Sequence, residues 1–307
     1  MGYETTTPLL KGIYPAIVTP VDAQGQLIEE SIRALVRQLA DSPIDGLYVG
    51  GGTGEGILLP VSVRKQMLEI VVDEIRILPS HSSLKVVAHV GAAEAVNTAD
   101  LAKHAKTMRV DAISAIPPLY YTYSREQICA YYGWLSSITD IPLIIYASAY
   151  ANVCFTMEMV KELLAYPNIK GLKFGSTNFY EMMRIRSMVP DDFSLLNGID
   201  EQLMFGLLAG VDGGIGTTYN VMPQSFCNLY AAWRDQDIKT MRILQKQINT
   251  IVAIIIKYPV IAAVKTMLDA SGIPMGPSVF PNDEFPIARR AEFLESLRQV
   301  GWPKLVP

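Results

Sequence analysis

The chain has 307 residues, half of them apolar, so it can bury a large core as one large domain or two small ones. Its net charge of −4 excludes a strongly basic surface, and we expect neither a nucleic-acid nor a membrane partner. Three cysteines, Cys129, Cys154 and Cys227, are odd in number and lack metal-ligand spacing. We expect them to be reduced and buried in a cytoplasmic protein.

Short runs rich in β-branched and aromatic residues alternate along the chain with segments of helical periodicity. The predicted strands are residues 12–19, 46–50, 85–90, 112–117, 142–148, 169–174, 193–197 and 213–217. Most of them are about 30 residues apart, as βα units are. Several, such as 142–148, are continuously apolar, which is typical of parallel strands covered on both faces.

The segments between these strands predict helices, for example at 62–75 and 156–166. Eight βα units favour a closed (β/α)8 TIM barrel over an open doubly wound sheet. After the eighth strand only helices are predicted, at 223–235, 237–257, 259–271 and 286–299. We interpret them as the last barrel helix and a C-terminal helical extension, which divides the chain into residues 1–235 and 236–307. The most apolar stretch, 251–264, is too short to cross a bilayer.

Function in such a barrel lies at the C-terminal ends of the strands. The second strand ends in residues 50–55, Gly-Gly-Gly-Thr-Gly-Glu, which can turn tightly and point backbone N–H groups at a carboxylate or phosphate. A plain flexible loop is the alternative. The eighth strand ends in a second Gly-rich turn, at 213–220, which carries the hydroxyl of Thr217.

Lys173 lies near the end of the sixth strand, which should have no face open to solvent. Lysine is rarely buried without a partner or a function. Burial disfavours the charged ammonium, and the neutral amine can attack a ketone to form an imine, an electron sink for C–C cleavage. The alternative is a lysine that is ion-paired to a barrel carboxylate. Lys170 is expected at the rim of the barrel or on its surface.

Other strand ends offer polar groups with two readings each. Tyr146, at the end of the fifth strand, can relay a proton or simply pack its ring in the core. Asp200 and Glu201 can bind hydroxyls or cap the following helix. Tyr120, in a loop with three tyrosines after the fourth strand, can pack against neighbours or relay protons. His89, in the third strand, has no metal-ligand spacing and is expected to be a hydrogen-bonded barrel residue.

Taken in order, these strand ends resemble the dihydrodipicolinate synthase/N-acetylneuraminate lyase family of class I aldolases over essentially the whole chain. The specific motifs are residues 50–55, Tyr146 before Lys173, Gly-Leu-Lys at 171–173 and Gly-Ile-Asp-Glu-Gln at 198–202. The segments PLYYTYS (118–124) and GLLAGVDGGIGTTYNVMP (206–223) are most similar to the neuraminate lyase branch.

The resemblance implies a reversible sugar-acid lyase that works through a Schiff base between Lys173 and pyruvate, with Tyr146 as the proton shuttle. Tyr120 would lie near the site, from a neighbouring subunit of a homotetramer. The partners would be pyruvate and a sugar-derived aldehyde, with no cofactor and no metal. The implied substrate-binding residues are Gly52 and Thr53 for the carboxylate, and Gly198, Asp200, Glu201 and Thr217 for hydroxyls of an open-chain sugar acid.

Three positions depart from the family pattern. Gly52 and Gly175 stand where the lyase branch usually has Ser and often has Thr, and Ala147-Ser148-Ala149 replaces its Asn-x-Pro. These changes widen the pocket or remove polar contacts. Residues 146–155 contain no arginine to bind a second carboxylate, which argues against dihydrodipicolinate synthesis.

Three other kinds of function remain open. An aldolase for a 2-keto-3-deoxy sugar acid, or a dihydrodipicolinate synthase-like enzyme, would keep the imine chemistry with another partner. A sugar-acid-binding barrel without catalysis would explain the hydroxyls missing at positions 52 and 175. A phosphate- or nucleotide-binding barrel rests on the Gly-rich turns alone.

Overall fold

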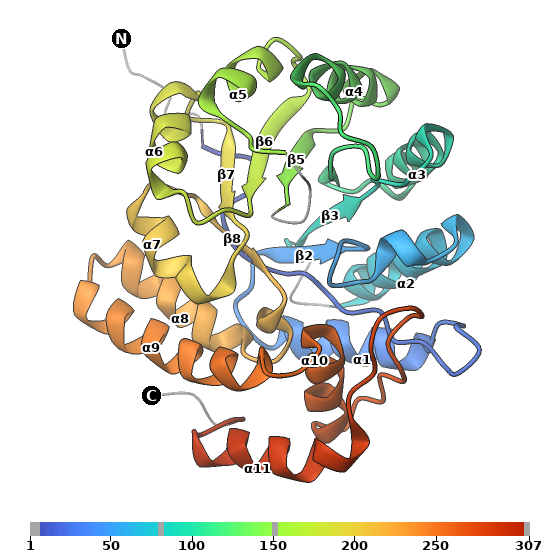
Figure 1. Ribbon diagram of the computed structural model, residues 1–307, viewed down its shortest axis with the longest axis vertical. Coiled ribbons are helices and arrows are strands. Elements are labelled where there is room, and N and C mark those ends of the chain that lie inside the picture. Colours follow the sequence, from blue (N-terminus) through green and yellow to red (C-terminus); the bar gives the residue numbers. More distant parts are fainter. Residues whose placement is uncertain (1–6, 79–82, 149–152, 304–307) are drawn as a thin grey trace.

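A computed structural model describes residues 7–78, 83–148 and 153–303 of the chain. Eight parallel strands form one sheet in the order β1-β8-β7-β6-β5-β4-β3-β2 (Figure 1). They are β1 Gly12–Pro15, β2 Gly46–Val49, β3 Lys85–His89, β4 Ala112–Ala115, β5 Leu143–Ala147, β6 Ile169–Phe174, β7 Ser194–Asn197 and β8 Gly213–Gly216. Hydrogen bonds from Asp45 N to Ile13 O and from Ile17 N to Tyr48 O, each 3.0 Å, connect β1 to β2. The predicted TIM barrel is confirmed.

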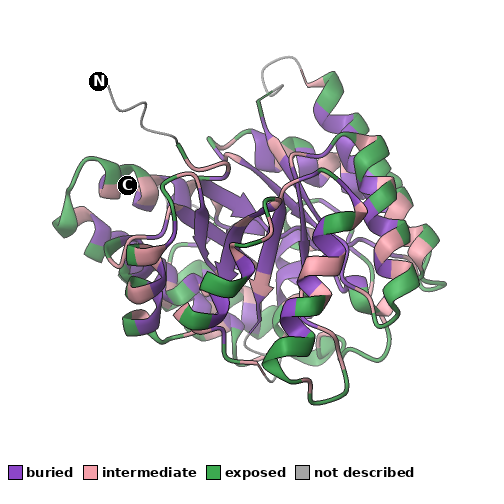
Figure 2. Cartoon of the chain, turned by 90° about the horizontal axis from the view of Figure 1, so that it is seen from above, coloured by how far each residue is buried: buried purple, intermediate pink, exposed green. Residues whose placement is uncertain are grey.

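Helices alternate with the strands and surround the barrel. They are α1 Glu29–Ala40, α2 Val61–Ile77, α3 Ala95–Met108, α4 Arg125–Ile138, α5 Met157–Leu163, α6 Phe179–Met188, α7 Leu203–Leu208 and α8 Pro223–Arg234. Figure 2 shows buried strands at the centre and helices that expose only their outer faces. This arrangement explains the continuously apolar strands, because both of their faces are covered.

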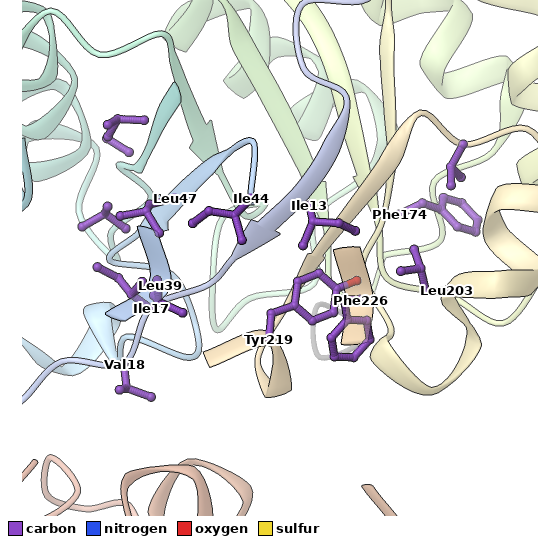
Figure 3. Close-up of a cluster of buried hydrophobic side chains, with 14 of the residues drawn as sticks. Ile13, Ile17, Val18, Leu39, Ile44, Leu47, Phe174, Leu203, Tyr219 and Phe226 are labelled. Atoms are coloured by element: carbon purple, nitrogen blue, oxygen red, sulfur yellow. The ribbon is translucent and has the colours of Figure 1, made fainter. Parts of the chain in front are cut away.

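Two hydrophobic clusters make up the core. The smaller fills the barrel interior, with Tyr14, Tyr48 and Ile144 among its members. The larger lies between the strands and the surrounding helices. Figure 3 shows part of it, where the rings of Tyr219 and Phe226 lie side by side with centroids 3.9 Å apart.

Three more helices follow the barrel: α9 Ile238–Ile255, α10 Val260–Ala270 and α11 Arg290–Gln299. They lie along one side of the molecule (Figure 1). Their apolar residues belong to the larger core cluster, and Trp302 donates a hydrogen bond from Nε1 to Val221 O (3.1 Å). We propose that residues 236–307 are an extension packed on a barrel formed by residues 1–235.

The predicted strands agree with the structure to within a few residues, and two expectations need correction, the end of β1 and the burial of one cysteine. β1 ends at Pro15, not at residue 19, although Ala16 N still donates to Gly216 O (2.9 Å). The expectation that all three cysteines are buried is wrong for Cys154, which is exposed, although all three are free. In the described part of the chain no single helix could span a membrane; α9 and α10 would satisfy the length and composition test together, but they are bent by 106°.

Candidate active site

Lys173 is buried at the C-terminal end of β6, with 4% of its surface exposed. Its Nζ lies 4.0 Å from the ring centroid of Tyr146, which is its direct neighbour on β5, and 4.7 Å from that of Tyr48. No described carboxylate lies within ion-pairing distance of this amine, whereas Lys265, also buried, is paired with Glu55. The sequence alternative of an ion-paired Lys173 is therefore not supported.

The tyrosine rings around Lys173 are held in fixed positions. Tyr48, on β2, donates from its hydroxyl to Ser114 Oγ (3.0 Å), and burial raises the pKa of Tyr48, so this phenol stays protonated. The rings of Tyr48 and Tyr146 meet edge-on, with centroids 6.4 Å apart. Sequence reasoning missed Tyr48, although it lies on the same strand only two residues before the Gly-rich motif and could have been found there.

The Gly-rich loop after β2 faces the turn after β8. Thr53 Oγ1 lies 2.7 Å from Thr217 Oγ1, so the two hydroxyls that the sequence singled out share a hydrogen bond. The loop turns on backbone bonds from Glu55 N to Gly52 O and from Gly56 N to Gly51 O, each 3.0 Å. Gly52 is exposed, and a Cβ there would meet no atom within 4 Å. The loop thus has the compact turn expected of an anion nest.

A cavity of about 670 Å³ opens above these groups. Four of the predicted catalytic and substrate-binding residues line it: Gly52, Thr53, Tyr146 and Thr217. A second cavity of about 350 Å³ lies over the ends of β5, β6 and β7, and Ser148 lines both cavities. Gly175 lines only the second one. The wider pocket expected from Gly175 is therefore present as this second cavity, at the end of β6.

Asp200 and Glu201 lie at the end of β7 but do not line either cavity. Asp200 Oδ2 accepts hydrogen bonds from Thr218 N and Thr218 Oγ1, both 2.7 Å. Burial raises the pKa of Asp200 to about 6, against the effect of the Thr218 bonds; the nearby Glu201 raises it further and Lys173 lowers it. The alternative that this carboxylate caps α7 is not supported, because the Asp200 side chain binds Thr218 and makes no capping hydrogen bond to the start of α7.

Glu201 is exposed, and its carbonyl accepts a 2.9 Å bond from Asn249 Nδ2 on α9. Gly198 is half-buried at the same strand end, where its N–H donates to Phe174 O (2.9 Å). Tyr120 is 93% exposed, with its ring edge-on to that of Tyr121 at 4.9 Å. Within one chain, the structure does not bring Tyr120 to Lys173.

His89 forms hydrogen bonds inside the barrel mouth, as predicted. Its Nε2 accepts from Ile116 N (3.2 Å), and Arg64 Nη2 donates to its carbonyl (2.8 Å). Burial, with Arg64 and Lys173 nearby, lowers the pKa of His89 well below its ordinary value, so the ring is neutral. Among the described residues no three His, Cys, Asp or Glu side chains group as metal ligands. Ala149, one of the positions that depart from the family pattern, lies outside the described residues.

The fold and the site define a TIM barrel with a buried lysine between tyrosines at the C-terminal ends of its strands. The model of the dihydrodipicolinate synthetase family matches residues 9–291, and the chain belongs to this family of lysine Schiff-base enzymes. The N-acetylneuraminate lyase of Escherichia fergusonii is 38% identical over 281 residues, which cover 90% of this chain and 93% of that protein.

Solved structures give the same relationship. CdNal from Clostridium difficile, crystallised in complex with mannosamine, superposes with a TM-score of 0.89 at 29% identity and covers 95% of this chain and 99% of its own. The Ruminococcus gnavus sialic acid aldolase superposes with a TM-score of 0.89 at 27% identity, over 95% and 97% of the two chains.

Proposed function

We propose that the protein is a class I aldolase that reversibly cleaves an N-acetylneuraminate-like sugar acid into pyruvate and an aldehyde. The observation that carries this proposal is the buried amine of Lys173, which lies against the ring of Tyr146, and Tyr146 in turn lines the 670 Å³ cavity. The similarity to N-acetylneuraminate lyases supports the same substrate class.

The Lys173 amine attacks the ketone carbon of the sugar acid, water leaves, and a protonated imine forms. The bond between the third and fourth carbons then breaks, its electrons move into the imine, and the aldehyde departs. Tyr146 takes the proton from the hydroxyl that becomes the aldehyde and returns it during the later steps. Protonation of the enamine carbon and hydrolysis of the imine release pyruvate and restore the amine.

The remaining polar groups bind the ends of the substrate. Thr53 and the N–H groups of the Gly-rich loop hold the carboxylate, which is stabilised by several convergent donors. Thr217, already 2.7 Å from Thr53, reaches the substrate from the opposite side of the mouth. The Gly198 carbonyl, Asp200 and Glu201 bind the hydroxyls of the open chain.

A second candidate is an aldolase for a 2-keto-3-deoxy sugar acid. The observation that favours it is the absence of side chains at Gly52, where a Cβ would meet nothing, and at Gly175, which borders the second cavity. Such a site has lost polar contacts and gained room, so its aldehyde partner can differ from that of the lyase branch.

A panel of sugar acids assayed for pyruvate release tests the proposal. We expect N-acetylneuraminate to be cleaved, and Lys173→Met to lower the rate at least about 1,000-fold because the nucleophile is lost. Release from 2-keto-3-deoxy acids alone would favour the second candidate. Sugar-acid binding without turnover, unchanged in Lys173→Met, would overturn both and leave a binding protein.

We also propose that the protein is a cytoplasmic homotetramer. Two separate surfaces support the assembly. Tyr120 and Tyr121 are 93% and 70% exposed after β4, and a patch on α6 and α7 exposes Tyr180, Met183, Phe205 and Leu208. Clustered exposed apolar residues of this kind mark protein interfaces. Two distinct contact surfaces on one chain suffice to build a closed tetramer.

A further inference from the structure

Glu55, at the end of the Gly-rich motif, has a backbone conformation that is unusual for a residue with a side chain. Its φ is 54°, in the left-handed region, and it directly follows Gly52-Thr53-Gly54. Gly56 packs so closely against the backbone of Gly50 that a Cβ on it would lie 1.9 Å from Gly50 O. In the loop that presents Thr53, Glu55 is therefore held in a backbone conformation that a residue with a side chain does not favour.

The Glu55 carboxylate is buried and has a partner for each oxygen. Oε2 accepts from Lys265 Nζ at 2.8 Å, and Oε1 accepts from Val279 N (2.9 Å) and from Asn282 Nδ2 (2.8 Å). The side chains of Glu55 and Lys265 are 0% and 2% exposed. A pair this deeply buried is costly to desolvate and adds little net stability, so a role in fixing geometry is a reasonable explanation of its presence.

Lys265 ties this carboxylate to the C-terminal extension. It lies on α10, 210 residues from Glu55, and also donates to Pro277 O at 2.8 Å. The loop after α10 supplies the Val279 and Asn282 donors. On the other side, Thr19 Oγ1 donates to Gly54 O at 2.6 Å. The Gly-rich loop is thus clamped between the β1 end of the barrel and the extension.

We infer that the Glu55–Lys265 pair is a positioning device that holds the Gly-rich loop in the shape that binds the oxo-acid carboxylate. The C-terminal extension is then part of the pyruvate site and not only a packed addition. This inference rests on the proposed function, because it assumes that Thr53 and its neighbours bind pyruvate. Neither side chain touches the reacting atoms, so the pair acts through the loop.

The test compares how pyruvate concentration controls borohydride trapping in the wild type, in Glu55→Gln and in the double variant Glu55→Gln/Lys265→Met. We expect the half-saturating pyruvate concentration to rise about tenfold or more in both variants, because a displaced loop loses donors to the carboxylate. At saturating pyruvate, Lys173 is still expected to be trapped. The double variant leaves no unpaired buried charge and is expected to fold even where the single one does not.

Glu74→Gln is the matched control. Glu74 is also a buried carboxylate, bound by Arg33 and Arg37 at 3.1 and 2.8 Å between α1 and α2. It should lower the melting temperature without changing the half-saturating pyruvate concentration. If neither Glu55 variant folds, Asn282→Ala is the substitute, because Asn282 is exposed and donates one hydrogen bond to the Glu55 carboxylate. It should raise the half-saturating pyruvate concentration less, about threefold.

The outcomes separate the two proposals. Failure of the wild type to form any adduct overturns the proposed function itself. If the wild type forms the adduct and the folded Glu55 variants have the same half-saturating pyruvate concentration as the wild type, only the positioning role is overturned. If the Glu55 variants have a smaller folded fraction but an unchanged half-saturating pyruvate concentration, the pair contributes to stability only. That result also contradicts the inference.

Discussion

Gly52 is a position at which a hydroxyl can be added without displacing any neighbour. A side chain at this position would enter open space, since a Cβ meets no atom within 4 Å. We expect Gly52→Ser to lower the KM for pyruvate about tenfold, because a hydroxyl next to Thr53 adds a hydrogen bond to a carboxylate. Steady-state kinetics of the condensation reaction measure this KM. Gly52→Ala is the control, and equal KM values for the Ser and Ala variants would refute a hydroxyl effect.

Asp200 makes the stability of the fold depend on pH. Its folded pKa is raised to about 6, above the ordinary aspartate value of 3.8, so the folded state binds this proton more tightly than the unfolded state. Its contribution therefore favours the fold below about pH 4 and is lost as the pH rises through about 6. The difference in Tm between Asp200→Asn and the wild type should grow in favour of the variant from pH 4 to pH 7. A constant difference across this range would contradict it.

The residues of the site were only partly predictable from the sequence. Lys173, Tyr146, Thr53 and Thr217 follow from their places at the ends of strands, because the topology of a barrel brings those ends together. The contacts of Tyr48 with Ser114 and of Glu55 with Lys265 join residues 66 and 210 positions apart. Such pairings depend on how strands and helices pack, which no local pattern encodes.

At the scale of elements, β8 is built from glycines because three neighbours approach it closely. A Cβ on Gly213 would lie 2.0 Å from Gly12 O, one on Gly214 would lie 2.4 Å from Tyr219 Oη, and one on Gly216 would lie 2.3 Å from Asp200 Oδ1. Because these positions lack side chains, β8 can pair with β1, which closes the barrel, and the Asp200 carboxylate can lie against Gly216.

Gly213→Ala is expected to destabilise the protein by about 1–3 kcal/mol or more, because the added methyl would overlap the backbone of β1. Thermal unfolding measures it as a lower Tm. Gly52→Ala, in open space, is the control and should leave Tm unchanged. A Gly213→Ala protein as stable as wild type would show that the β1–β8 seam can open without cost.

The helices and strands were predicted well because the patterns that indicate them are local. The residues at which they end were not always predicted correctly. The β1 run continues in sequence to residue 19, yet the strand stops at Pro15. Beyond that point the chain lacks a continuous partner strand and makes single bonds to the β8 and β2 ends. The contact of Asp200 with Thr218 was also not predictable, because Thr218 belongs to the next βα unit.

At the scale of the whole molecule, the α6–α7 patch allows a test of the proposed tetramer. Phe205→Glu places a charge in the middle of this patch, where Phe205 is 52% exposed. We expect it to convert a tetramer into a dimer, because the Tyr120 surface is untouched. Light scattering after size-exclusion chromatography measures the mass. Ile77→Glu, at an exposed residue on α2, is the control and should leave the mass unchanged. A tetrameric Phe205→Glu protein would exclude this patch as an interface.

The central claim is that the Lys173 amine forms an imine with pyruvate. Incubation with pyruvate and borohydride, followed by mass spectrometry of the proteolytic peptides, tests it most directly. We expect the peptide that contains Lys173 to gain the mass of one pyruvate less one oxygen atom, and Lys173→Met to gain nothing. An adduct on a different lysine, or no adduct at any pH at which the protein is folded, would contradict the account.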